Sequence, residues 1–356
     1  MGASSAKGHA HTCEPLHKGS LMREKTLFKG HAVTLQAVPL RDHFQTQTPL
    51  ANHESHFASC FGHIGILSLC RGDRANAFDS RMMEELLETV KIIREHSGDT
   101  PDHPAPRDDS GHGDHRHPQE PVNLRVVVVH GQGSHFCAGA DLGWMRQAAQ
   151  LSFDENIADA GLLQRLFAEF KNIPVPTLGL IHGSIMGGGV GLVACMDMVI
   201  ACDDSKFSLS EVKLGLAPAV ILPYLKAKMA PGFLRQYALT GQVFSAQRAF
   251  ENGLVQEVVR AEDKFPALVR ILEQVLMGSP QAQRALKNYL NQNEGLSLKQ
   301  GPTAFESIWT PVTLIAHLRT SEEGQKGLHA FFQKAPAPWR PDSSWKETLT
   351  QMIQQV

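Results

Sequence analysis

The sequence predicts an α/β fold that ends in a helical region. Between residues 56 and 260, short apolar segments with strand character alternate with segments of helical periodicity. Glycine-rich stretches stand where two of these strands meet the helices that follow them. From residue 261 to residue 356 the pattern is helical. Many short strands with helices between them are typical of an α/β domain.

The core begins with a strand and a long helix. The apolar run over residues 62–69 predicts a short strand. A helix is predicted from about Ser80, because serine is a favoured N-cap residue. Apolar residues then recur at helical spacing and indicate one buried helix face: Met83, Leu86, Leu87, Val90 and Ile93.

Strands and helices continue to alternate along the rest of the core. Residues 125–130 predict a buried strand, and strands are also expected at 177–182, 198–202 and 206–209. The capping box from Ser152 to Glu155 predicts a long helix that ends near Lys171. Helices are expected around residues 190–196 and between Ser245 and Gly253, which are an N-cap and a C′ residue in suitable places.

Two segments are predicted to lack a core of their own. Residues 1–55 show no sustained period, so we expect a poorly ordered N-terminal extension. Residues from about 97 to 123 are rich in Pro, Gly, Asp and His and are expected to form a low-complexity surface insertion. Because the four histidines of this insertion lack a fixed spacing, solvated chain is favoured over a metal site: His103, His112, His115 and His117.

Composition excludes several classes of function. Lys and Arg total 34 against 36 Asp and Glu, so the sequence offers no basic footprint for nucleic acid or an anionic membrane. The longest apolar runs are too short to span a bilayer. No Cys-x-x-Cys pair is present, and we expect free thiols in a reducing compartment, the cytoplasm or the mitochondrial matrix: Cys13, Cys60, Cys70, Cys137, Cys195 and Cys202.

Two glycine-rich turns carry the first functional signal. Residues 135–142 (HFCAGADL) follow one predicted strand, and residues 182–192 (HGSIMGGGVGL) follow another. Each turn exposes backbone N–H groups where a helix begins, and the helix dipole favours negative charge there. Either glycine-rich segment alone is more simply interpreted as a tight turn of the chain. Two such turns side by side could hold one oxyanion. Neither matches a P-loop or a dinucleotide-binding fingerprint.

Three blocks of sequence resemble one known family in order and spacing. They are residues 136–142 (FCAGADL), 183–197 (GSIMGGGVGLVACMD) and 206–218 (KFSLSEVKLGLAP). Together they resemble the crotonase superfamily of enoyl-CoA hydratases and isomerases. The resemblance covers about residues 64–259, and it continues more faintly through residues 322–334. It implies a crotonase-like spiral of ββα turns, followed by helices that form trimers or dimers of trimers.

The resemblance also implies roles for individual residues. The backbone N–H groups of Ala140 and Gly188 are expected to form an oxyanion hole for the thioester carbonyl of an acyl-CoA, and Glu211 is expected to be the catalytic carboxylate. Neither a metal nor a cofactor beyond the coenzyme A of the substrate is expected. The residues expected to line the substrate site are Arg74, Ala75, Ala77, Ala138, Gly139, Asp141, Leu142, Gly187, Gly191, Pro218 and Lys334.

One departure from the family pattern bears on mechanism. Well-known hydratases of this family use two glutamates, and this sequence has Gly191 at the position of the first. We expect Glu211, in an apolar pocket that raises its pKa, to act as both base and acid. The residues around the motifs, including 144–146 (WMR), look similar to hydratases of 3-methylglutaconyl-CoA or isohexenylglutaconyl-CoA. Loss of a side chain at Gly191 is expected to leave room for a substrate carboxylate or a water molecule.

Four alternatives remain beside this hydratase hypothesis. A single glutamate suffices for an enoyl-CoA isomerase, and a related dehydratase would act on a thioester of an acyl-carrier protein. Gly191 also leaves open a catalytically inactive paralogue that assembles with an active partner. RNA binding is disfavoured, because Lys91 and Arg94 stand among acidic residues on the first helix.

The remaining polar residues near the turns are expected to be structural. His130, His135 and His182 flank the two turns, and a satisfied structural histidine is the favoured interpretation of each. Cys137 lacks the partner pattern of a nucleophile. Trp144 is expected to shape the wall of the substrate channel.

Overall fold

The computed structural model describes residues 25–40, 62–98, 122–293 and 310–354. A seven-stranded sheet forms the centre of this part of the chain, with the strand order β1-β2-β3-β4-β5-β7-β10. The predicted α/β class is therefore confirmed. The strands of this sheet are β1 (Lys25–Lys29), β2 (Val33–Pro39), β3 (His63–Leu69), β4 (Leu124–Gly131), β5 (Thr177–Ile181), β7 (Met198–Cys202) and β10 (Glu257–Val259).

Five strands of the large sheet run parallel, from β3 to β10. Every residue of β3 and of β4 is buried, as expected for parallel strands with helices on both faces. The valines of β4 alternate between the two faces: Val127 and Val129 belong to one apolar core, and Val126 and Val128 to the other. The apolar run that predicted a buried strand at residues 125–130 thus contributes side chains to both cores.

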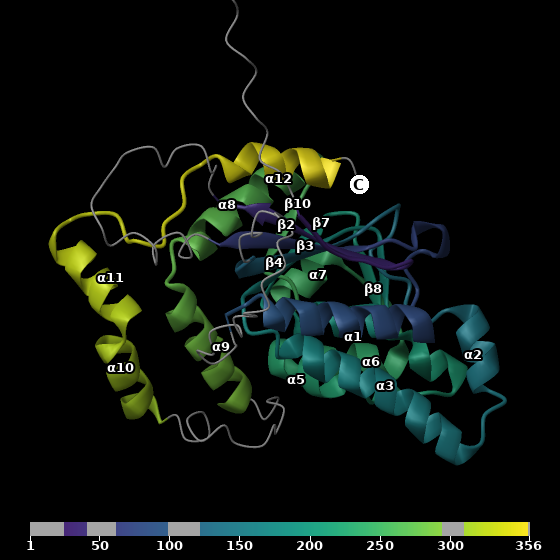
Figure 1. Cartoon of the computed structure of the whole chain (residues 1–356). Helices are drawn as coiled ribbons and strands as arrows, with labels where there is room; N and C mark the ends of the chain where they lie inside the picture. The colour runs from purple at the N-terminus through teal and green to yellow at the C-terminus, as the bar shows by residue number, and fades with distance from the viewer. Residues whose placement is uncertain (1–24, 41–61, 99–121, 294–309, 355–356) are drawn as a thin grey trace, which may run out of the picture.

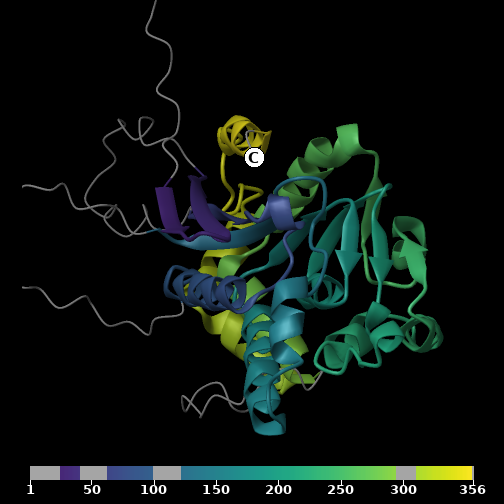
Figure 2. The same ribbon diagram turned by 90° about the vertical axis from the view of Figure 1, so that its right-hand side faces the viewer.

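The prediction of a poorly ordered extension over residues 1–55 is wrong for residues 25–40. These residues form β1 and β2, which pair antiparallel and add to the edge of the sheet next to β3. Figure 2 shows this hairpin in purple at one side of the sheet. The helix residue Glu85 holds its turn, because its carboxylate accepts the N–H groups of His31, Ala32 and Val33 at 3.0, 2.7 and 3.1 Å. This contact joins residues more than fifty positions apart, so local periodicity did not reveal it.

A second, three-stranded sheet lies where the two glycine-rich turns meet. It consists of β6 (Ser184–Met186), β8 (Lys206–Ser208) and β9 (Val243–Ser245), in the order β6-β8-β9. β6 and β8 are parallel and pair Met186 with Ser208. The residues that follow these two strands are therefore neighbours.

Helices cover both faces of the large sheet (Figure 1). α1 (Ser80–Glu95), α3 (Phe153–Lys171) and α4 (Gly188–Cys195) supply buried residues to one core, and α8 (Lys264–Leu276) and α12 (Trp345–Gln354) supply the other. The remaining helices are α2 (Leu142–Ala148), α5 (Leu222–Lys228), α6 (Pro231–Thr240), α7 (Ala246–Glu251), α9 (Pro280–Asn293), α10 (Pro311–Thr320) and α11 (Glu322–Phe332), with short 3₁₀ helices η4 (Gly72–Arg74), η5 (Ser210–Leu214) and η6 (Ala261–Asp263).

Two predicted helix starts can be compared with the structure. The capping box of Ser152 and Glu155 is present, and α3 ends at Lys171 as predicted. The predicted N-cap of α1 is displaced by one residue. Asp79 occupies the N-cap and accepts the N–H of Met82 at 2.8 Å, whereas Ser80 is the first helical residue.

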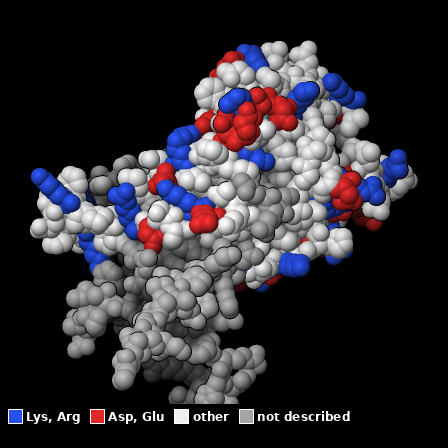
Figure 3. All heavy atoms as spheres, turned by 90° about the horizontal axis from the view of Figure 1, so that it is seen from above, with Lys and Arg blue, Asp and Glu red and all other residues white. Residues whose placement is uncertain are grey.

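Several predictions concern parts of the chain that lie outside the described residues. The low-complexity insertion is one of them, except for its flanks, and its four histidines lie outside as well. In the described segments no group of three or more potential ligands could hold a metal ion. None of the helices in these segments combines the length and the apolar character needed to cross a membrane. On the face over α8 and α12, basic side chains are interspersed with acidic ones (Figure 3).

Candidate active site

The two glycine-rich turns lie against each other. Cys137 and Ile185 form an isolated parallel bridge, in which Cys137 N–H donates to Ser184 O at 3.2 Å and Met186 N–H donates to Cys137 O at 3.0 Å. A Cβ atom added at Gly139 would lie 2.8 Å from Met186 O. Gly139 also has a φ of +88°, so both its backbone conformation and the close approach of the second turn require glycine.

The N–H group of Ala140 faces the second turn. Ala140 bridges Phe78, and the bonds of this bridge run from Phe78 N–H to Gly139 O at 2.7 Å and from Asp141 N–H to Phe78 O at 2.8 Å. Ala140 lies between Gly139 and Asp141, which bond to Phe78. In a parallel bridge of this kind, the N–H group of the middle residue points away from the bonded neighbour. Among the described residues, no acceptor meets the Ala140 N–H. Ala140 itself is half-buried.

The N–H group of Gly188 is the second unpaired donor. Gly188 is the first residue of α4, and the N–H groups of a first helical turn have no partner inside the helix. Its neighbour Gly187 differs, because the Gly187 N–H donates to Ser208 O at 2.9 Å. The bridge between Cys137 and Ile185 makes neighbours of the two turns that carry these donors, and their joint action on one oxygen stays a prediction.

The carboxylate of Glu211 lies over this pair of turns. A Cβ atom added at Gly187 would lie 2.9 Å from Glu211 Oε1. Glu211 belongs to η5, which follows β8 directly, and β8 is paired with the strand that leads to Gly187. The structure therefore brings the Glu211 carboxylate beside Gly187, the residue that precedes Gly188.

The carboxylate of Glu211 is poorly solvated. Its Oε2 atom is buried and has no hydrogen-bond partner in the described part of the chain. Burial raises the pKa of Glu211 above the usual value of a glutamate, and its own backbone N–H partly opposes this shift. Such a carboxylate accepts a proton more readily than one in water, which is the property that acid–base chemistry near neutral pH requires.

The expectation of free space at Gly191 is wrong. Gly191 is buried in α4, and a Cβ atom added there would lie 2.3 Å from Ile221 Cγ2 and 3.2 Å from Phe167 Cζ. The side chain of Ile221 thus occupies the volume that a larger residue at 191 would need. Because Ile221 precedes α5 and lies 30 positions away in sequence, the glycine alone could not reveal this packing.

Residues 74–77 hold the first turn rather than forming an open surface. Ala75 O accepts the Ala138 N–H at 2.9 Å, and Ala77 O accepts Arg71 Nη1 at 2.6 Å. Arg74 differs from both, because 68% of its side chain is exposed and it faces Asp73 at 4.0 Å. Of the predicted residues in this turn, Arg74 is the one whose side chain is available to a ligand at the surface.

The Asp141 carboxylate is occupied by protein groups. Its Oδ1 accepts the N–H groups of Gly143 at 2.7 Å and Trp144 at 3.2 Å and so caps α2, while its Oδ2 faces Arg71. Partial burial acts to raise the pKa of Asp141, but these two amides and the charge of Arg71 hold it below its usual value. The Trp144 indole N–H donates to Asp159 at 3.1 Å and ties α2 to α3.

Three other predicted substrate residues have different surroundings. Leu142 is exposed at the start of α2. Pro218 is buried, and its carbonyl accepts the N–H groups of Ile221 and Leu222, both at 3.2 Å. Lys334 follows α11, which lies at the far side of the molecule from α2 (Figure 1). In a single chain Lys334 is therefore apart from the two turns, and its contact with coenzyme A stays a prediction.

The histidines near the turns have structural contacts, as predicted. His130 Nε2 and Ser68 Oγ are 2.7 Å apart, and burial lowers the pKa of His130 to about 4. His182 Nε2 lies 2.8 Å from Gly133 O, and His135 Nδ1 accepts the Ser184 N–H at 3.1 Å. Burial raises the pKa of the Cys137 thiol to about 12, which leaves it protonated and unsuited to nucleophilic attack.

Comparison with known proteins identifies the family to which these features point. A model of the enoyl-CoA hydratase/isomerase family matches residues 117–342. The chain is 31% identical over 223 residues to a mevalonyl-coenzyme A hydratase of Aspergillus fumigatus, covering 61% of this chain and 78% of that protein. It is 28% identical over 221 residues to a carnitinyl-CoA dehydratase of Proteus mirabilis, covering 61% and 82%.

Solved structures show the same fold. An enoyl-CoA hydratase of Shewanella pealeana is 34% identical and superposes with a TM-score of 0.63, covering 78% of this chain and 92% of that one. Its similarity, together with the α/β architecture and the C-terminal helices described above, confirms the crotonase-like fold that the three sequence blocks predicted.

Proposed function

Because this chain belongs to the enoyl-CoA hydratase/isomerase family, we propose that its site adds water across the double bond of an enoyl-CoA. The observation that supports this most is the contact of two turns that carry unpaired amide donors, Ala140 and Gly188, with the partly buried carboxylate of Glu211 beside Gly187. Coenzyme A enters as part of the substrate, and we propose that the reaction needs no other cofactor.

The two amides would act on the thioester carbonyl. Addition of hydroxide at Cβ of an enoyl thioester moves negative charge to the carbonyl oxygen and forms an enolate. The N–H groups of Ala140 and Gly188 would donate to this oxygen as an oxyanion hole, and the N-terminus of α4 adds a favourable dipole. A donor of this kind is typically worth about 3–4 kcal/mol of transition-state stabilisation.

Glu211 would carry out both proton transfers. As a carboxylate it takes a proton from the attacking water while the oxygen bonds to Cβ, and as a carboxylic acid it then returns a proton to Cα. The raised pKa of Glu211 supports this double role, because the two protonation states differ less in energy near neutral pH than they do for a solvated glutamate.

We further propose 3-methylglutaconyl-CoA, or a related branched glutaconyl-CoA, as the substrate. Support comes from the resemblance of the sequence around Trp144, Gly191 and Glu211 to hydratases of such thioesters. Ile221 fills the space at Gly191, so that position offers no pocket for a substrate carboxylate. Recognition of the acyl group would therefore depend on other walls of the site.

An enoyl-CoA isomerase is the second candidate. One observation favours it: Ile221 blocks the place of a second acid, and a single carboxylate suffices to move a proton between two carbons. Two relatives of this chain named above are a hydratase and a dehydratase, and these names favour water addition. No product from any of the CoA thioesters in the assay below would favour either a dehydratase of a carrier-protein thioester or an inactive paralogue.

The test is a product analysis with purified protein. Wild type is incubated separately with 3-methylglutaconyl-CoA, crotonyl-CoA and a 3-enoyl-CoA, and hydroxyacyl products are distinguished from shifted double bonds by mass and NMR. We expect hydroxyacyl product from wild type and a loss of about 100- to 10,000-fold in kcat in Glu211→Gln. Equal rates for the two proteins would exclude Glu211 as the base, and a shifted double bond without added water would favour the isomerase.

We also propose that copies of this chain assemble into a trimer or a dimer of trimers. Apolar side chains are exposed along the C-terminal helices, with exposed fractions of 75% for Phe331, 75% for Phe332 and 74% for Val312. Leu286 and Leu290 on α9 are exposed as well. Exposed apolar groups of this size in a monomer are typical of an interaction surface, and a second copy of the chain would cover them.

A reducing compartment, the cytoplasm or the mitochondrial matrix, stays the proposed location. The described cysteines support it, because all of them are free thiols: Cys70, Cys137, Cys195 and Cys202.

A further inference from the structure

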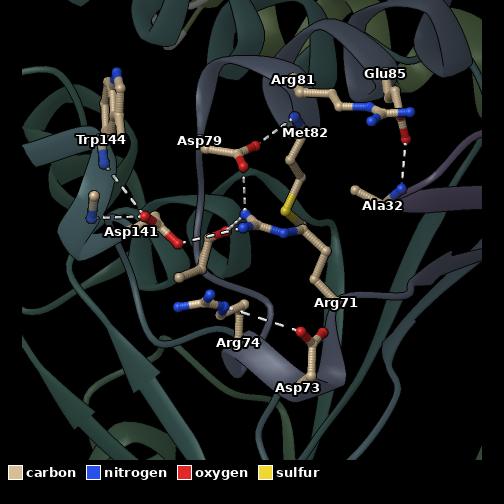
Figure 4. A network of polar contacts seen from close by, with 12 residues as sticks. Ala32, Arg71, Asp73, Arg74, Asp79, Arg81, Met82, Glu85, Asp141 and Trp144 are labelled. Atoms are coloured by element: carbon tan, nitrogen blue, oxygen red, sulfur yellow. Dashed lines mark hydrogen bonds and ion pairs between the residues drawn. The ribbon is translucent and has the colours of Figure 1, made fainter. Parts of the chain in front are cut away.

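Arg71 connects two helix starts beside the first turn. It lies just after β3, and its side chain is largely buried, with 16% exposed. Its Nη1 atom lies 2.9 Å from Asp79 Oδ2, and its Nη2 atom lies 3.3 Å from Asp141 Oδ2. Figure 4 shows the guanidinium group between these two carboxylates, whereas Arg74 lies apart from them.

Both partners of Arg71 are helix caps. Asp79 caps α1 through the Met82 N–H, and Asp141 caps α2. Because a planar guanidinium group offers donors in fixed directions, one arginine sets the position of both caps relative to each other. A lysine, with a single ammonium group, could not reproduce this geometry.

The segment between Arg71 and the cap Asp79 is bonded to the segment that carries the amide donor. Residues 75–78 run alongside residues 138–141 and exchange three backbone hydrogen bonds with them, at 2.7 to 2.9 Å. The Ala140 N–H is therefore directed by the position of this segment. The segment also includes two consecutive non-glycine residues in the left-handed region, Ala75 at φ +49° and Asn76 at φ +52°.

Such a conformation persists only when surrounding contacts hold it, since the left-handed region is strained for residues that carry a side chain. Arg71 is one of these contacts, because its Nη1 donates to Ala77 O at 2.6 Å. The Asn76 amide is another, because Nδ2 donates to Gln132 O and His135 O, both at 2.9 Å. The contacts of Arg71 and Asn76 thus hold residues 75–78 in place beside residues 138–141, which carry the donor.

We propose that Arg71 is a positioning residue of the oxyanion hole, which aligns the Ala140 N–H by holding Asp79, Asp141 and Ala77 O together. The inference rests on the proposed function of Ala140 and extends it to a residue outside the reach of substrate. Arg71 acts through the backbone of residues 138–141 and touches no reacting atom. Loss of its contacts would let the Ala140 amide turn away from the carbonyl oxygen.

The variants separate this role from a plain contribution to stability. Arg71→Lys keeps the positive charge and removes the fork of donors. Asp141→Asn keeps an acceptor for the N-cap of α2 and removes the charge pair with Arg71. Arg260→Lys is the matched control, because Arg260 also pairs with two carboxylates, Glu262 at 3.1 Å and Asp263 at 3.0 Å, on an exposed surface.

We expect kcat to fall about 10- to 100-fold in Arg71→Lys and in Asp141→Asn, since a small misplacement of a catalytic group can cost this much. KM should change less than about threefold, because the binding of coenzyme A does not depend on the direction of one amide. Arg260→Lys should retain the wild-type kcat. Thermal unfolding and circular dichroism verify that each variant is folded.

Infrared spectroscopy reports whether the Ala140 N–H is aligned with the thioester carbonyl, and it does so without turnover. Butyryl-CoA labelled with ¹³C at the carbonyl lacks the reacting double bond, and hydrogen bonds to its carbonyl oxygen lower the stretching frequency. We expect a lowered frequency in wild type and Arg260→Lys, and a frequency closer to that of the free thioester in Arg71→Lys and Asp141→Asn. The test separates the two proposals. No lowering in bound wild type would contradict the oxyanion hole itself, whereas full lowering with wild-type kcat in both variants would overturn the role of Arg71 alone.

Discussion

The spiral core around the site and the C-terminal helices are held together by different means. The core relies on two apolar clusters on the faces of one sheet, in which the side chains of β3 and β4 are buried. The helices α9, α10 and α11 contribute little to these clusters and expose apolar side chains instead. The core is complete within one chain, and the C-terminal helices present a surface that suits a partner.

Polar contacts fasten the start of the C-terminal region to the core. Lys287 on α9 is buried, and its Nζ lies 2.6 Å from Asp197 Oδ2 and 2.9 Å from Val175 O. Arg125 on β4 donates to Gly278 O at 2.9 Å and to Trp339 O at 3.1 Å. These contacts are directional, so they set where α9 lies, whereas the apolar clusters mainly supply free energy of folding.

The largest expected effect on stability is at Lys287. Lys287→Met removes the ammonium group paired with Asp197, although the charge of Lys171 remains and Asp197 Oδ2 still accepts the N–H and hydroxyl of Thr177 at 2.7 and 2.9 Å. Removing one partner of a buried ion pair typically costs about 3–5 kcal/mol. Urea unfolding measures the loss. Lys326→Met is the control, because Lys326 pairs with Glu322 on an exposed helix face and should change stability by less than about 1 kcal/mol. Similar effects of the two variants would contradict the fastening role of Lys287.

A smaller loss is expected from filling the core at Gly191. Gly191→Ala would place a methyl group against Ile221, and overpacking of this kind typically costs about 1–3 kcal/mol. Ile221→Ala should cost less stability in the Gly191→Ala protein than in wild type, because the added methyl group fills part of the space that the isoleucine leaves. Gly161→Ala is the control, because a Cβ atom at Gly161 in α3 would meet nothing within 4 Å and alanine favours a helix. A stabilising Gly191→Ala would show that Ile221 moves freely and that the site has room.

The carboxylate of Glu211 should make stability depend on pH in a defined direction. Because its folded pKa is raised above the unfolded value, the folded state binds the proton more tightly, and wild type loses stability as pH rises from the unfolded to the folded pKa. Glu211→Gln has no such titration. We therefore expect the two proteins to be similar in stability at acid pH and the variant to be the more stable above the folded pKa. Chemical unfolding over a pH series measures this difference, and a constant difference at all pH values would contradict the raised pKa.

The smallest effect on the single chain is expected at the exposed C-terminal helices. Phe331→Ser with Phe332→Ser removes two exposed rings, and exposed substitutions usually change stability by no more than about 0.5 kcal/mol. Light scattering after gel filtration should nevertheless show loss of the oligomer. Phe153→Ser on α3 is the control, because Phe153 is 80% exposed but belongs to the core region. An unchanged oligomer in the double variant would place the interface elsewhere.

Local features of the sequence determined the elements of this protein and the chemistry of its turns. The apolar run of β4, the capping box at Ser152 and the glycines at 139 and 188 depend on neighbours a few residues away, so periodicity and residue type predicted them. The resemblance of three blocks to a known family then predicted which amides and which carboxylate act together. The structure brings Glu211 beside Gly187, and the joint action of Ala140, Gly188 and Glu211 stays a prediction.

Tertiary structure alone decided what fills and supports the site. Ile221 occupies the space beside Gly191, Arg71 joins the caps of two helices, and Glu85 holds the turn of the β1–β2 hairpin. Each of these contacts joins residues distant in sequence, and no local period or capping pattern reports which side chain will arrive from another element. Packing of the whole chain is what selects those partners, because close-packed interiors admit only the side chains that fit.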